Sequence, residues 1–299
     1  MAKTSVLLGF CMAVCAVTTA QADLPLNVEA LLTANKAWRA EFNLVYANSD
    51  RRNVDSRFAT LQLAPGQFIT LPLVVSQARQ NLDILVASAG MRYGLSADTE
   101  ILARASALSR HARSQDAEGA SSTHSSRFNN AWIGINRRLS ADDDTPAVLG
   151  FAELALAENV AVEGNELAYG RTALLGITVY RTTDPLVLSI TGGYQYSAAR
   201  DTAEQSVDPG DLLFINPNIG FAVNHEVTLT SGMQWRWQQR ERHDGQPQGI
   251  RTTQTRLELG MGYAWSRLTT VQIVGRMDMS GDAGAEIGAT VIYKFPNRA

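Results

Sequence analysis

The sequence predicts an all-β protein: a single transmembrane antiparallel β-barrel of about twelve strands, preceded by a short helical segment. Three observations lead to this fold. After residue 37, apolar and polar side chains alternate with the period of two that is typical of strands. The alternating segments are roughly ten to thirteen residues long, the length that a tilted membrane strand needs. Their connections alternate between short turns and long polar loops, as in outer-membrane barrels.

Residues 1–22 have the features of a cleaved secretory signal peptide. Lys3 precedes an apolar run that begins at Ser5, and Ala20 and Ala22 provide a small-residue cleavage site. The run is too short to span a membrane comfortably, so removal is favoured over a membrane anchor. We expect export and, for a barrel, a final location in the outer membrane of a Gram-negative bacterium.

Composition excludes several classes of function. Both cysteines, Cys11 and Cys15, lie in the leader, so thiol catalysis, thiolate metal sites and disulfides are excluded for the mature chain. The acidic run 142–144 lacks the spacing and the glutamate of an EF-hand, which indicates a solvated turn. A net charge of −3 and the lack of a basic tract argue against nucleic acid. We expect no metal and no cofactor.

The segment 23–36 contains the one helical pattern, LPLNVEALLTANK. Asn27 is a suitable N-cap, and Val28, Leu31 and Leu32 fall on one face of the helix. We expect this segment to lie in the periplasm or to plug the barrel, with Val28, Leu31 and Leu32 as its contacts to the pore.

The barrel domain is expected at 37–295, followed by a tail at 296–299. An even number of strands places both termini at the end with the short turns, which is the periplasmic end in bacterial barrels. The expected strands are about 37–47, 83–95, 100–111, 128–139, 147–157, 171–181, 186–196, 212–223, 226–238, 252–265, 268–279 and 285–295.

The first long connection, about residues 48–82, leaves the strand number open. Its segment 66–76 is apolar enough to form either a hairpin within the loop or a further strand of the wall. A further wall strand would make the number odd, against the rule for bacterial barrels.

The two faces of the strands set their orientation. In one strand, Leu257, Leu259 and Met261 alternate with Arg256 and Glu258. Charged side chains are costly in a dry core unless paired, but cost little in a wet lumen. We therefore expect the polar face to line the lumen and the apolar face to contact the lipid bilayer; a soluble sandwich would reverse this arrangement.

The polar face is rich in arginine and glutamate. Inward charges of mixed sign are expected to pair and stiffen the barrel, or to filter solutes by charge. The lumen-lining candidates are Arg39, Glu41, Arg92, Glu100, Arg104, Glu153, Arg236, Arg256, Glu258, Arg276 and Glu286.

The stretch NLDILVASAGMRYGLSADTEILAR contains a strand that ends in Arg-Tyr-Gly-Leu at 92–95, a short turn with Asp98, and Glu100 at the next strand. It resembles a recurring unit of a family of outer-membrane proteins named for the meta-pathway of phenol degradation, and QTRLELGMGYAWS is similar to the same unit. The resemblance implies an outer-membrane barrel that acts as a channel for small, often aromatic, compounds. A looser resemblance, carried by a helical segment ahead of the barrel, to export pores for functional-amyloid subunits implies a polypeptide cargo.

The sequence thus predicts an outer-membrane channel that passes small solutes, aromatic or hydrophobic ones included, by passive diffusion. Gating is expected from residues 24–36 or from the connection 48–82. The alternatives are an export pore for secreted or amyloid-type polypeptides and a structural barrel without transport. An enzyme is not expected, since the sequence has no G-x-S-x-G motif and its four histidines have no evident catalytic partners.

Overall fold

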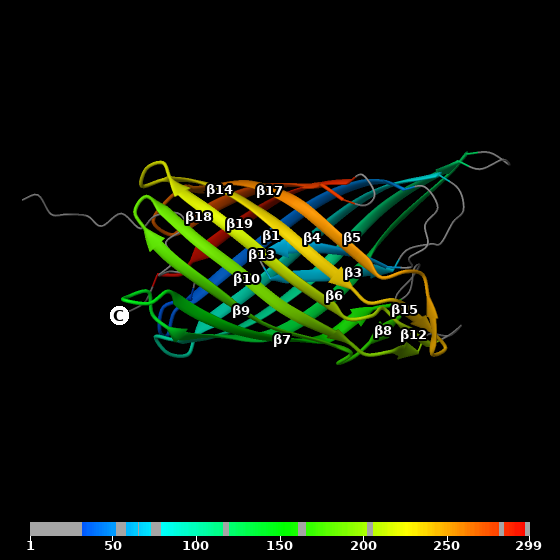
Figure 1. The fold of residues 1–299 in the computed structure, drawn as a ribbon, viewed down its shortest axis with the longest axis horizontal. Helices are drawn as coiled ribbons and strands as arrows, with labels where there is room; N and C mark the ends of the chain where they lie inside the picture. The colour runs from blue at the N-terminus through cyan, green and yellow to red at the C-terminus, as the bar shows by residue number, and fades with distance from the viewer. Residues whose placement is uncertain are drawn as a thin grey trace, which may run out of the picture.

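A closed antiparallel barrel forms the body of the protein. The computed structural model describes residues 32–51, 58–64, 66–72, 79–115, 120–160, 166–201, 206–280 and 284–296. Within these residues, twelve tilted wall strands run from one end of the barrel to the other (Figure 1). The wall strands are β1 (Trp38–Arg51), β4 (Arg79–Gly94), β5 (Thr99–Gln115), β6 (Ala120–Ser140), β7 (Ala147–Asn159), β9 (Thr172–Thr183), β10 (Leu186–Ser197), β13 (Leu212–Ala222), β14 (Val227–Gln238), β17 (Thr252–Ala264), β18 (Thr269–Asp278) and β19 (Gly284–Lys294).

The hydrogen-bonded ladder closes on itself. The strand order is β6-β5-β4-β1-β19-β18-β17-β14-β13-β10-β9-β7, and the pairing of β6 with β7 completes the ring. β1 pairs with β19, so the first and last strands of the wall are neighbours. The predicted fold class is confirmed, and β4, β5 and β6 extend beyond their predicted bounds at the end with the long loops.

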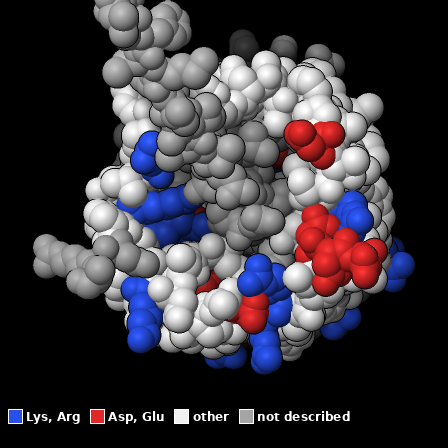
Figure 2. Space-filling model, turned by 90° about the vertical axis from the view of Figure 1, so that its left-hand side faces the viewer, with Lys and Arg blue, Asp and Glu red and all other residues white. Residues whose placement is uncertain are grey.

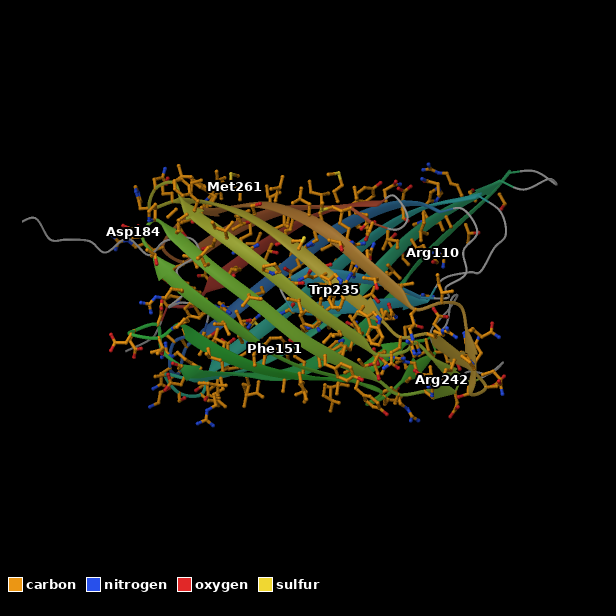
Figure 3. All side chains as sticks on the ribbon, viewed as in Figure 1. Arg110, Phe151, Asp184, Trp235, Arg242 and Met261 are labelled. Carbon is orange, nitrogen blue, oxygen red and sulfur yellow. The ribbon has the colours of Figure 1, made fainter. Side chains whose placement is uncertain are left out.

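The two ends of the barrel differ. At one end short turns join the strands; the turn before β14, for example, is capped by Asn224, whose Oδ1 accepts hydrogen bonds from the backbone N–H groups of Glu226 and Val227. The other end carries a four-stranded sheet of loop segments. Figure 3 shows Asp184 at the first end and Arg242 at the second. This sheet consists of β11 (Arg200–Asp201), β12 (Ser206–Asp208), β15 (Glu241–His243) and β16 (Gln246–Gln248), while β8 (Leu167–Ala168) extends the wall beside β7.

The outer surface of the wall is apolar. Leu259 and Met261 are 55% and 42% exposed, whereas Arg256 on the same strand, β17, is 8% exposed. Figure 3 shows Met261 on the outside of the barrel. Strand β17 therefore points its Leu and Met side chains outward and its arginine inward, as the alternation predicts. Among the described residues, no helix has the length and apolar character needed to cross a bilayer.

The connection after β1 forms a separate hairpin, β2 (Phe58–Ala64) and β3 (Gln67–Pro72), that lies inside the barrel. Its apolar side chains pack against the inner face of the wall. Where it is described, the segment 66–76 therefore belongs to a hairpin within the loop and does not form a further wall strand. One cluster contains Leu61, Leu63, Ile69 and Leu71 with Val45, Ala47, Leu82, Ile84, Val86, Leu108 and Ala112. A second contains Phe68 with Trp132, Ala155, Leu174, Leu212 and Phe214.

These clusters correct the expectation that a polar face lines the whole lumen, because part of the inner face of the wall is apolar and packed. It is polar on β14, β17, β18 and β19, but apolar toward the long-loop end of β1, β4 and β5. Leu82, Ile84 and Val86 alternate with lipid-facing residues such as Leu85, so this part of β4 is apolar on both faces. The hairpin keeps water away from the inner face of β4.

The helical prediction for 23–36 falls partly outside the described residues, since these begin at Leu32. For 32–36 the prediction is wrong, because this stretch bonds to the wall instead of to itself. The Thr33 N–H donates to Glu100 Oε2 at 2.6 Å, and the Lys36 N–H donates to the carbonyl oxygen of Gly94 at 2.8 Å. A Cβ at Gly94 would lie 2.1 Å from the Ala34 carbonyl oxygen, so only glycine permits this approach.

Replacing Gly94 with alanine is expected to separate residues 33–36 from the wall, because the added Cβ overlaps backbone atoms. Hydrogen exchange of the Thr33 and Lys36 amides should accelerate by about tenfold or more, measured by mass spectrometry. The control is Gly275→Ala, where a Cβ meets no atom nearer than 3.9 Å. Unchanged exchange in Gly94→Ala would show that the contact does not depend on glycine.

Candidate functional site

A cavity of about 1300 Å³ lies inside the barrel. It reaches the short-turn end, where turn residues such as Glu226, Ser266 and Arg267 line it. Figure 2 views this end and shows acidic and basic side chains close together on its rim. Among the described residues, the cavity therefore extends to the end with the short turns.

The hairpin β2–β3 closes the opposite end of the cavity. The described residues around its turn line the cavity floor, namely Gln62, Leu63, Ala64, Gly66 and Gln67. A Cβ at Gly66 would lie 3.3 Å from Phe151 Cζ, which places the turn directly against β7. In this structure a solute that enters from the short-turn end meets the hairpin before it reaches the long loops.

Two wall arginines hold the hairpin through its backbone. Arg236 Nη1 donates to the carbonyl oxygen of Thr60 at 2.7 Å, and Arg276 Nη1 donates to that of Gln62 at 3.2 Å. Charge-assisted hydrogen bonds of this kind are stronger than those between neutral groups. The hairpin is thus fixed by two arginines on β14 and β18 as well as by its apolar clusters.

The predicted lumen residues lie on the inner face of the wall and form three groups. In the first, Arg92 Nε lies 2.8 Å from Glu41 Oε1, and Arg92 Nη1 lies 2.7 Å from Glu100 Oε1. Arg39 Nη2 lies 3.2 Å from the same oxygen of Glu41. Asn136 donates a further hydrogen bond to Glu100 at 2.7 Å. This group contains two positive and two negative side chains at the level where residues 32–36 meet the wall.

The second group joins β5 to β7. Arg104 Nη2 lies 2.8 Å from Glu153 Oε2, and both side chains are almost completely buried. The Arg104 guanidinium also lies over the Trp132 ring, 4.8 Å from its centroid, which adds a cation–π contact. Neither charge of this pair remains uncompensated.

The third group spans β14, β17, β18 and β19. Arg276 Nε lies 2.7 Å from Glu258 Oε2. Arg256 pairs with Asp278 at 2.5 Å and also with Glu286. With Arg236, the group contains three arginines and three carboxylates: Arg236, Arg256, Arg276, Glu258, Asp278 and Glu286. The three groups are therefore each balanced in formal charge.

Of the plug candidates, Leu32 alone lies within the described residues. It lines the cavity and packs against the apolar cluster of Ala147, Leu149 and Tyr180. Val28 and Leu31 lie outside the described residues.

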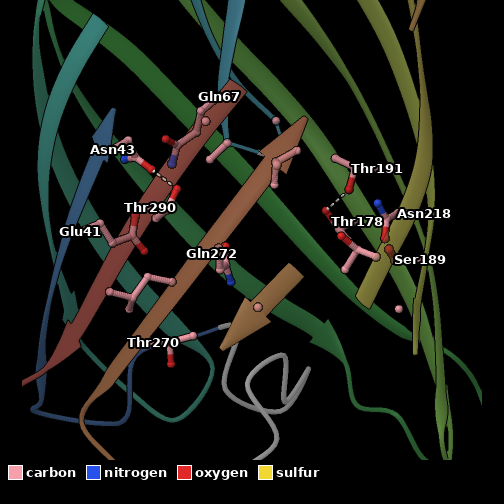
Figure 4. A pocket seen from close by; sticks show the side chains of 18 of the residues that line it. Glu41, Asn43, Gln67, Thr178, Ser189, Thr191, Asn218, Thr270, Gln272 and Thr290 are labelled. Carbon is pink, nitrogen blue, oxygen red and sulfur yellow. Dashed lines mark hydrogen bonds between the residues drawn. The ribbon is translucent and has the colours of Figure 1, made fainter. Parts of the chain in front are cut away.

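Several lining residues escaped sequence reasoning because they are uncharged. Figure 4 shows hydroxyl and amide side chains along the cavity wall, among them Thr178 and Thr191, whose hydroxyl oxygens lie 3.0 Å apart. Asn43 and Thr290 share a second hydrogen bond at 2.7 Å. Phe151 was missed because β7 carries apolar side chains on both faces, which hides the alternation.

A closed barrel with an apolar outer wall and internally paired charges has the architecture of an outer-membrane barrel. The fold is similar to that of an outer membrane channel from Pseudomonas putida F1, with a TM-score of 0.60 and 10% identity over 88% of this chain and 97% of that chain. It is also similar to the translocator domain of the autotransporter NalP from Neisseria meningitidis, with a TM-score of 0.53 and 11% identity over 90% of this chain and 92% of that chain. No protein-family model and no curated protein sequence matches the chain. These likenesses establish the fold.

Replacing Arg104 with methionine is expected to lower the free energy of unfolding by about 3–5 kcal/mol, because Glu153 is left buried without its partner. Reversible urea unfolding in detergent micelles measures the change. The control is Arg138→Met, which breaks the half-exposed pair with Asp98 and should cost about 0–1 kcal/mol. Equal losses in both variants would mean that burial of the pair is unimportant.

Proposed function

We propose that the protein is a channel in the outer membrane of a Gram-negative bacterium and passes small solutes by passive diffusion. The observation that carries this proposal is the cavity inside the barrel, which is open at the short-turn end and closed at the other by a loop hairpin. Short turns face the periplasm in bacterial barrels, so the open mouth would face the periplasm and the hairpin the cell exterior.

The hairpin β2–β3 is the gate in this proposal. It belongs to a loop rather than to the wall, so it can shift without breaking the barrel ladder. Its strand β2 is held by two hydrogen bonds, from Arg236 to the backbone of Thr60 and from Arg276 to that of Gln62. When the tip moves away from Phe151, the cavity would connect with the space under the long loops.

The cavity lining favours small solutes over a polypeptide. The hairpin lies inside the lumen, and the free space beside it is about 1300 Å³. This volume is only somewhat larger than the roughly 300–1,000 Å³ of a pocket for a small molecule. The apolar side chains of Leu149, Phe151 and Val187 beside hydroxyl groups suit solutes with an apolar ring, aromatic compounds included.

A structural barrel without transport is the competing function, and the closed hairpin favours it. Removing the hairpin separates the two. We expect a variant in which residues 58–72 are replaced by a Gly-Ser linker to show several-fold higher conductance in planar bilayers than the intact chain. The reason is that the linker leaves the cavity open at both ends.

A second variant guards against a folding defect in the deletion. The double substitution Ile69→Asp and Leu71→Asp introduces two charges at side chains that are each 1% exposed within the inner cluster, so the hairpin is expected to leave the lumen while the wall stays unchanged. Exposed Ile250→Asp is the matched control and should conduct like the intact chain. If neither hairpin variant conducts although both fold as barrels, the channel proposal is wrong.

A further inference from the structure

The closed end of the cavity contains amide side chains that lack hydrogen-bond partners. Gln234 on β14 and Gln62 on the hairpin are each 1% exposed and line the cavity. Among the described atoms, neither Oε1 nor Nε2 of Gln234 has a partner, nor does Oε1 of Gln62 or Oδ1 of Asn216. Three acceptors and one donor group that border the cavity are therefore unsatisfied among the described atoms.

Two of these amides are neighbours on paired wall strands, and the third is on the hairpin. Ile215 pairs with Trp235 and Asn218 with Gly232, so Asn216 lies across from Gln234 on the adjacent strand. Pro217 beside them has no N–H and interrupts the ladder between β13 and β14 at this level. The bond from Arg276 to the Gln62 carbonyl fixes the hairpin amide against the same side of the barrel.

Packing does not require amides at these positions. A buried polar group without a partner costs roughly 1–3 kcal/mol, whereas an apolar side chain of the same size would not. Unpaired donors and acceptors that converge on a concave, mostly apolar site are typical of ligand binding. The amides therefore have a use that the fold alone does not explain.

The surroundings favour an uncharged ligand. Arg236 and Arg276 near the amides belong to the charge-balanced third group, so no net charge faces the closed end from that group. On the same side of the barrel, β10 and β13 carry the hydroxyl and amide groups of Ser189, Thr191 and Asn218 (Figure 4). An ion would have to leave water without gaining an opposite charge here.

Phe151 adds an apolar surface to this site. It lines the cavity and packs against the apolar cluster around Phe68, beside the hairpin turn. Aromatic side chains pack well against flat apolar faces of a ligand, while amides and hydroxyls bond its rim.

We propose that the closed end of the cavity is a binding site for a small, uncharged ring molecule that carries several hydroxyl groups. Gln234 donates and accepts hydrogen bonds to its hydroxyls, Asn216 and Gln62 accept further ones, and Phe151 packs against the face of the ring. The site is reached from the short-turn end with the hairpin in place. This inference sharpens the proposed channel function, because it names the class of solute.

The test measures binding by equilibrium dialysis with the full chain in detergent micelles. The probes are glucose and catechol, two uncharged hydroxylated rings, together with glucuronate and glucosamine as charged counterparts of glucose. We expect one or both uncharged rings to bind at least about tenfold more tightly than the charged ones. Equal binding of charged and uncharged probes, or no binding of any probe, overturns the proposal.

Variants connect the binding to the amides. Gln234→Leu keeps the side-chain size and removes both hydrogen-bonding atoms, so binding of the uncharged ring should weaken by about tenfold. Gln272→Leu is the matched control, since Gln272 lines the cavity on another strand. The affinity of this variant for the uncharged ring should stay within about twofold of that of the intact chain. If Gln234→Leu does not fold, Asn216→Leu serves in its place. A folded Gln234→Leu that binds like the intact chain overturns the proposal.

Binding in micelles and conductance in bilayers keep the two proposals apart. Selective binding without conductance in any hairpin variant would support the binding site and contradict the channel proposal. Conductance without selective binding would support the channel and contradict the binding site.

Discussion

The closed hydrogen-bonded ladder is the constraint on which the rest of the structure depends. Each wall strand pairs on both sides, and the β6–β7 and β1–β19 pairings leave the ring without an open edge. In a bilayer an unpaired backbone group finds no water, so only such a closed sheet is stable there. Closure also divides each strand into two faces, because successive side chains point to opposite sides. The apolar outer surface and the charged inner one both follow from this division.

The inner charges must then compensate one another. The hairpin and the wall clusters restrict water in the lumen, so an unpaired arginine or glutamate would be costly. The observed arrangement places each predicted arginine beside a carboxylate or a backbone carbonyl, as in the pair of Arg104 with Glu153. Charge balance stiffens the barrel across its strands and leaves hydrogen-bonding amides and hydroxyls as the groups that a solute meets.

Local patterns predicted the wall well, and long-range contacts explain what they missed. Alternation is a property of neighbouring residues, so the expected strand 186–196 agrees closely with β10, and 252–265 with β17. The bond from Arg276 to Gln62 joins residues 214 positions apart, which no local pattern contains. The apolar character of β4 on both faces was a signal that something covers its inner side. The stretch 32–36 has helical propensity, but its contact with Gly94 is tertiary and overrides that preference.

The same contacts that build the inner core also limit how the gate can move. Five apolar side chains of the hairpin are buried, namely Leu61, Leu63, Phe68, Ile69 and Leu71. Exposing an apolar side chain of this kind costs roughly 1.5–3 kcal/mol, so full release of the hairpin would cost on the order of 10 kcal/mol. A state of that energy is essentially unpopulated, and passive diffusion cannot depend on it. Passage instead requires a smaller shift, in which the turn leaves Phe151 while the apolar clusters stay packed. The bonds of Arg236 and Arg276 to the hairpin backbone are the contacts that such a shift must break.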